Sequence, residues 1–154
     1  MSKVFEDYFS EIQADMVSIC LEYVGNRAEK IYVHCISEDT SIFCNFFYKI
    51  NGIIVKKHKL NDALSSSFFV KKYNTSINRQ DAVLDILIAD VEKLIDVCTQ
   101  HKKNMPNEIR LYYDVKKNSL DAHYRYDSVC TESGKSEIEL ANEWFDKVSS
   151  RDDM

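Results

Sequence analysis

The chain has few of the residues and motifs on which reaction centres depend. Only three glycines and one proline occur in its 154 residues, and no glycine-rich phosphate loop can be found. It also lacks a G-x-S-x-G elbow and a paired-histidine metal motif, and its four histidines share no common spacing. We therefore expect that the chain is not an enzyme, that it has no catalytic residue and that it binds no cofactor or metal ion.

Disulfide and zinc frameworks are also disfavoured. The five cysteines are odd in number and form neither a C-x-x-C pair nor a zinc-ligand spacing with histidine. Most of them occupy positions that the local pattern makes apolar, so we expect small buried side chains in a reducing compartment. No segment approaches the roughly 18 apolar residues of a membrane span, and the N-terminus lacks the pattern of a secretory signal. These features predict a soluble cytoplasmic protein with no membrane contact.

Positive charge is in short supply. The chain carries 20 basic against 25 acidic residues, a net charge of -5, which argues against direct binding of nucleic acid because phosphate contacts need a basic surface. Residues 81–100 contain five acids and one lysine, a net charge of -4. A basic protein partner is easier to reconcile with this balance than an acidic one.

Hydrophobic periodicity predicts a single α+β domain over residues 1–154, in which an antiparallel sheet packs against helices. Helical spacing of apolar residues covers 3–24 and 79–101, and a final helix opens at 136. Residues 30–37, 41–50 and 53–60 are rich in β-branched and aromatic types, and a hairpin follows at 108–127. The predicted order is α-βββ-α-ββ-α, with a frayed tail over 150–154. Residues 61–76 fit either a short helical turn or a plain loop.

The hairpin at 108–127 is the most regularly patterned stretch. Apolar residues such as Ile109, Leu111 and Tyr113 alternate with charged ones, so one face is apolar and the other polar. The neighbouring helices are the expected cover for the apolar face, and the polar face suits water or a protein partner. Tyr112, Tyr124 and Tyr126 would also suit base stacking in an RNA-binding sheet, but the acidic neighbours disfavour that interpretation.

Capping and turn residues fix several predicted boundaries. Asn51-Gly52 predicts a tight hairpin turn, because both central residues of a type I′ turn need positive φ. The strand that follows ends in a lysine-rich run, which is typical of a sheet edge. Asn78 is the predicted cap of the long helix, and Ser136 with Glu139 forms a capping box before the final helix, whose predicted inward residues are Ile138, Ala141, Trp144, Phe145 and Val148.

The segment from Val70 to Asp127 resembles the YezG-like immunity proteins, which are bacterial antitoxins. The shared features are a Lys-Tyr-Asn-x-Ser stretch at 72–76, a long acidic helix, a proline before a strand, and a closing strand of alternating aromatic and polar residues that ends at Tyr126-Asp127. In element order the likeness extends from Phe5; the chain differs from the family in its cysteine content and in lacking a glycine-rich first hairpin. The resemblance implies a small cytoplasmic protein that binds and neutralises a cognate toxin, often a nuclease domain.

We expect the partner site on the outer surface of the long helix, because this surface is acidic and the other surfaces suit a basic partner less well. Its candidate residues recur at spacings that hold them near one another: Asp81, Asp85, Glu92 and Asp96. The polar face of the hairpin is the secondary candidate, through Tyr112, Asp114, His123 and Arg125. The alternatives are a non-catalytic structural or adaptor domain with another protein partner and, in third place, an RNA-modifying enzyme.

Overall fold

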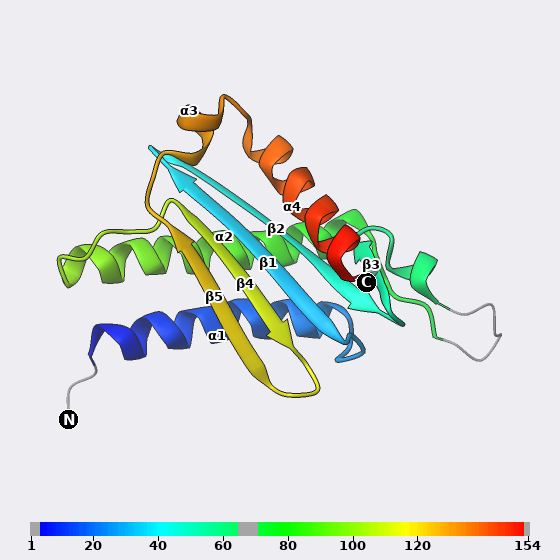
Figure 1. The fold of residues 1–154 in the computed structure, drawn as a ribbon. Helices are drawn as coiled ribbons and strands as arrows, with labels where there is room; N and C mark the ends of the chain where they lie inside the picture. The colour runs from blue at the N-terminus through cyan, green and yellow to red at the C-terminus, as the bar shows by residue number, and fades with distance from the viewer. Residues whose placement is uncertain (1–3, 65–70, 153–154) are drawn as a thin grey trace.

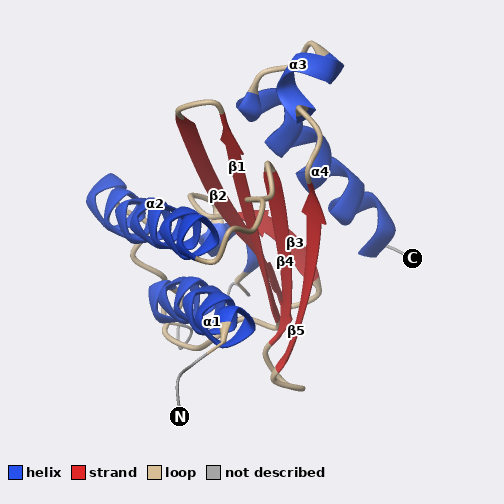
Figure 2. Ribbon diagram, turned by 90° about the vertical axis from the view of Figure 1, so that its left-hand side faces the viewer, coloured by secondary structure: helices blue, strands red, loops and turns tan. Residues whose placement is uncertain are grey.

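The computed structural model describes residues 4–64 and 71–152 and shows an α+β domain with the predicted order of long elements. A five-stranded antiparallel sheet lies between two helical layers, with α1 and α2 on one side and α3 and α4 on the other (Figures 1 and 2). Of the two short helices, α3 was not predicted, whereas η1 lies at the start of the stretch for which a short helical turn was one of two alternatives. The elements are α1 (Phe5–Tyr23), β1 (Lys30–Glu38), β2 (Ser41–Ile50), β3 (Ile53–Lys56), η1 (Leu60–Ala63), α2 (Ile77–Gln100), β4 (Glu108–Asp114), β5 (Ser119–Arg125), α3 (Val129–Ser133) and α4 (Glu137–Asp152).

The strand order β3-β2-β1-β4-β5 places β1 at the centre of the sheet. The β2–β3 turn is tight as predicted, with Asn51 and Gly52 at φ values of 52° and 77°. The strand β3 lies at the edge, as its lysines indicated, but it ends at Lys56 instead of continuing to residue 60. The Lys59 N–H donates to the Lys56 carbonyl at 2.9 Å, so the chain turns there and enters η1.

One face of the sheet forms the main core with α1 and α2. The helical spacing of apolar residues predicted for 79–101 is confirmed, since Leu87 and Leu94 lie on one side of α2 and are fully buried. They join Met16 of α1 and the sheet residues Val33 and Phe46. Burial of each large side chain contributes roughly 1.5–3 kcal/mol, so this cluster supplies much of the apolar stabilisation.

The expectation that the 108–127 hairpin has one buried face and one solvent-exposed face was wrong for β4. The polar face of β4 lies partly under α4, where Trp144 is 2% exposed and Glu108 is also 2% exposed. On the other face, the apolar side of β5 is less covered than expected: Leu120 and Tyr124 are 36% and 39% exposed. The reason is topology, because β5 is the edge strand whereas β4 pairs with the central β1.

The helix boundaries show which capping signals operate. Ser76, not Asn78, caps α2 by accepting from the Arg79 N–H at 3.4 Å. The capping pair of α4 is confirmed, since the Glu139 N–H donates to Ser136 Oγ at 3.2 Å. Ile138, expected to point inward, is 63% exposed, and Leu140 is buried in its place. The helix α4 includes residues 150–152 of the expected frayed tail, while residues 153–154, like 65–70, lie outside the described part of the chain.

Candidate functional site

The helices α1 and α2 together form a strongly acidic surface. The helix α1 contains five acidic residues and no basic one, and α2 contains five acidic and two basic residues, so the pair has a net charge of -8. The rest of the chain therefore has a net charge of +3. The two helices lie side by side on one face of the sheet (Figure 1). We call their exposed carboxylates the acidic layer: Glu6, Asp7, Glu11, Asp15 and Glu22 on α1, and Asp81, Asp85, Glu92 and Asp96 on α2.

The four residues predicted on α2 share one stripe of that layer. Asp81, Asp85, Glu92 and Asp96 are all exposed, on the side of the helix opposite the buried stripe. At a rise of 1.5 Å per residue, the stripe extends over about 22 Å. Within the described residues none of these four carboxylates forms an ion pair. They therefore present uncompensated negative charge to the solvent.

Asp90, the remaining acidic residue of α2, does not belong to the outer surface of the helix. Its side chain is 2% exposed, at the interface of α2 with α1. Burial, followed by a hydrogen bond with Asp15 and the charge of Asp15, raises the pKa of Asp90 to about 7, and Lys93 at 3.8 Å acts in the opposite direction. Near neutral pH this carboxyl group exists in both protonation states.

A second surface lies on the other side of the sheet, in a groove of about 450 Å³ between α4 and the β4–β5 hairpin. We call it the α4 groove; its lining comes from β1, β4, β5, the hairpin turn and α4. Three of the four secondary candidates line it, namely Tyr112, Asp114 and His123. The rings of Tyr112 and His123 lie 4.9 Å apart. Arg125 lies outside the groove lining, where it pairs with Asp127 and approaches Glu108 at 3.8 Å.

Trp144 of α4 closes the floor of the groove through contacts with three strands, β1, β2 and β4. Its Nε1–H donates to the Tyr112 hydroxyl at 3.2 Å, and the Arg110 guanidinium lies 5.3 Å from the centre of its ring. The same ring meets His34 of β1 edge-on at 4.9 Å. The β1–β4 register explains this grouping, because His34 is paired with Arg110 and Tyr32 with Tyr112.

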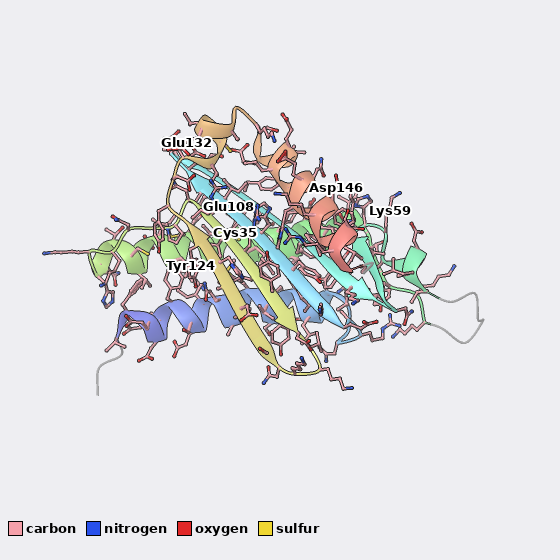
Figure 3. The ribbon with its side chains drawn as sticks, viewed as in Figure 1. Cys35, Lys59, Glu108, Tyr124, Glu132 and Asp146 are labelled. Carbon is pink, nitrogen blue, oxygen red and sulfur yellow. The ribbon has the colours of Figure 1, made fainter. Side chains whose placement is uncertain are left out.

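Beneath this floor lies a buried ionisable cluster. His34 Nε2 and Glu108 Oε2 are 2.6 Å apart, and Arg110 donates to the same carboxylate oxygen at 3.3 Å (Glu108 is labelled in Figure 3). Burial lowers the pKa of His34, although the hydrogen bond with Glu108 acts to raise it. Burial alone would raise the pKa of Glu108, but the hydrogen bond from His34 and then the charges of His34, Arg110 and Arg125 hold it below its usual value.

The cysteines occupy the apolar positions that the sequence pattern indicated. Four are buried, Cys130 is half-buried, and all five are free. Cys35 and Cys44 face each other across β1 and β2 with their sulfur atoms 3.6 Å apart, and this hydrogen bond together with burial raises the pKa of the Cys35 thiol (Cys35 is labelled in Figure 3). Among the residues that the structure describes, no group of three His, Cys, Asp or Glu side chains could hold a metal ion.

Several residues of both surfaces were not identified from the sequence. The acids of α1 looked like an ordinary solvated face, and only their position beside α2 makes them part of one surface. Trp144 was assigned to the core as one member of an apolar stripe. Lys30 and Arg110 stood at polar positions of alternating strands, which is also the pattern of plain solvent exposure.

Comparison with known proteins gives little further information. No protein-family model matches the chain. It is 25% identical, over an alignment of 170 residues, to Autophagy-related protein 11 of Kluyveromyces lactis; the alignment covers 96% of this chain and 16% of that protein. The chain thus spans about one-sixth of the length of this relative, and the match does not show a common family. In the described ranges, no helix is both long and apolar enough to cross a lipid bilayer.

Proposed function

We propose that this chain is an immunity protein that neutralises a cognate toxin, most simply a nuclease domain, in the cytoplasm of the cell that makes it. The observation that carries the proposal is the acidic layer, in which two helices with a net charge of -8 present their carboxylates from the same side of the sheet. The resemblance of residues 70–127 to YezG-like immunity proteins supports the same conclusion.

Electrostatics explains how such a layer would act. A nuclease presents a basic surface to its phosphate substrate, so it is attracted to a carboxylate surface before any contact forms. A carboxylate that becomes desolvated against a basic group holds the complex together, and its removal costs about 2 to 5 kcal/mol of binding. A carboxylate at the rim changes mainly the association rate and its dependence on salt. The complex would therefore form quickly and weaken as ionic strength rises.

The test uses the protein encoded next to the gene for this chain, whose C-terminal domain is expressed as the toxin. The triple variant Asp85→Lys, Glu92→Lys and Asp96→Lys reverses charges along the α2 stripe. A matched variant with Asp62→Lys, Glu132→Lys and Asp146→Lys makes the same change in net charge at exposed positions outside the acidic layer. We expect the wild type and the matched variant to protect cells that express the toxin, and the stripe variant to bind it at least about tenfold more weakly.

Circular dichroism confirms that each variant is folded before binding is measured. Equal protection by both triple variants would move the interface away from α2. A neighbouring gene without a toxic product, or a toxin against which the wild type gives no protection, would contradict the immunity function itself.

An adaptor domain is the second candidate function. It is favoured by the match to Autophagy-related protein 11, because the chain corresponds to only 16% of that protein, as a module of a larger assembly would. An adaptor domain would bind a protein partner but would not protect cells from the neighbouring gene product. The same protection assay therefore separates the two functions.

A further inference from the structure

The α4 groove has a charge opposite to that of the acidic layer. Five basic side chains line it, and only two carboxylates, Asp114 and Asp121, do so. Of these, Asp114 is paired directly with Lys30 in the β1–β4 register, where opposite charges attract. The groove therefore attracts anions, although the whole chain has a net charge of -5.

Arg110 is the most strongly fixed of these basic groups. Its Nε and one terminal nitrogen both lie 3.3 Å from Glu108 Oε2, and its guanidinium lies over the Trp144 ring. Its side chain is 24% exposed, so part of it remains accessible from the groove. A guanidinium held in this way loses little conformational entropy when it binds an anion, and its planar donors suit a carboxylate. Arg110 is therefore a preorganised cationic group at the base of the groove.

Lys147 and Arg151 complete the basic wall from α4. They are four residues apart and both are exposed, so they lie on neighbouring turns of one helix face. Arg110 lies across the groove on β4. An extended segment that enters between α4 and the hairpin would therefore meet basic groups on both sides.

We propose that the α4 groove binds a short acidic peptide segment of a protein partner, through Arg110, Lys147 and Arg151. The packing of the aromatic rings favours a peptide over a nucleic acid. Binding of single strands needs exposed rings on which bases stack, but Trp144 is 2% exposed and Tyr32 is 4% exposed, and the half-buried Tyr112 packs edge-on against both. A continuous phosphate backbone would also approach Asp121, which lines the groove, whereas a peptide can confine its carboxylates to the basic walls. This surface is independent of the proposed toxin site, which lies on the opposite side of the sheet (Figure 2).

Trp144 is the only tryptophan of the chain and reports directly on this groove. The experiment titrates the full chain with acetylated hexaglutamate at low ionic strength and follows the tryptophan emission. Hexaglutamine serves as the uncharged peptide control, and hexathymidylate and inorganic phosphate serve as the other anions. The same titrations are made on Lys147→Glu/Arg151→Glu and on a matched variant, Lys59→Glu/Lys72→Glu, whose exposed lysines do not line the groove.

We expect a saturable change of emission with hexaglutamate, none with hexaglutamine, and an affinity that falls as salt is added. The Lys147→Glu/Arg151→Glu variant should bind about tenfold more weakly or worse, and the matched variant should bind as the wild type does. Absence of saturation by hexaglutamate, or an equal loss in both variants, would overturn the proposal. Tighter binding of hexathymidylate would assign the groove to nucleic acid, and equally tight binding of phosphate would assign it to simple anions.

A second copy of the chain, with its own acidic layer, is the remaining occupant to test. Sedimentation of the wild type over a range of concentrations should show a monomer. Self-association that is abolished by Lys147→Glu/Arg151→Glu would overturn the assignment to a partner peptide.

Discussion

Replacement of Asp90 by asparagine should stabilise the protein at alkaline pH. Asparagine has nearly the shape of the aspartic acid side chain, but it stays neutral and can donate a hydrogen bond to Asp15. The pKa of Asp90 in the folded protein is about 7, above its ordinary value of 3.8, so the folded state holds the proton more tightly than the unfolded chain. The stability that this proton contributes is complete at acidic pH and is lost as the pH rises from about 4 to about 7.

The size of the effect follows from the difference between the two pKa values. Each unit corresponds to about 1.4 kcal/mol, so the shift of Asp90 sets a ceiling of about 4 kcal/mol above neutral pH. Lys93, whose Nζ lies 3.8 Å from Asp90 Oδ1, stabilises the charged form of Asp90. The exposed Asp15 also brings solvent close to the Asp90 carboxyl group. We therefore expect Asp90→Asn to gain about 1 to 3 kcal/mol in free energy of unfolding at about pH 8, and little at about pH 4.

Urea unfolding of the wild type and of Asp90→Asn over this pH range measures the difference. Because His34 and Glu108 are present in both proteins, their titration cancels and the difference curve reports Asp90. Asp85→Asn, which removes a carboxylate from an exposed position of the same helix, is the control variant. If Asp90→Asn were less stable than the wild type at about pH 8, or if its difference curve were flat, the buried Asp90 would not hold its proton more tightly in the folded state.

Two further substitutions test the rest of the interior. Glu108→Gln should lower the free energy of unfolding by about 3 kcal/mol at neutral pH, because it leaves His34, Arg110 and Arg125 without their shared carboxylate. The folded-state pKa of Glu108 is lowered, so in urea unfolding this difference should shrink as the pH falls below the ordinary value of 4.5; a constant difference would contradict the ionic role. Cys44→Ala should cost about 1 kcal/mol in the same assay, since Cys44 is 7% exposed and fills a small core volume beside Cys35. Mass spectrometry of the native wild type should show no stoichiometric zinc, and its presence would refute a purely structural role for the cysteines.

Local patterns predicted the parts of the fold that depend on a single segment. The periods of α1 and α2 and the Asn51-Gly52 turn reflect backbone geometry that nearby residues determine. The sheet order depends on pairing between distant segments, and β1 with β4 joins residues about 80 positions apart in sequence. No local signal showed that α4 would cover the second face, so the buried state of Glu108 was not predicted.

The two candidate surfaces also differ in whether one segment or several distant segments determine them. The stripe on α2 was predictable because the positions of Asp81, Asp85, Glu92 and Asp96 around a helix follow from its period alone. The α4 groove was not predictable as a whole, because it needs β1, the β4–β5 hairpin and α4 in one place. Asp90 lies next to Val91 at the margin of the buried stripe, and only the position of α1 decides that it is covered.

The sheet separates the acidic layer from the α4 groove. Val33, Phe46 and Leu111 of the core between them are fully buried, and the acidic layer and the α4 groove use no residue in common. Effects at sites without shared partners usually add, so occupation of one surface should leave affinity at the other nearly unchanged. A basic partner on α1 and α2 would even reduce the negative field that repels an acidic segment from the groove. We therefore expect the fold to hold the two proposed partners of opposite charge at once, which a single mixed surface could not do without competition between them.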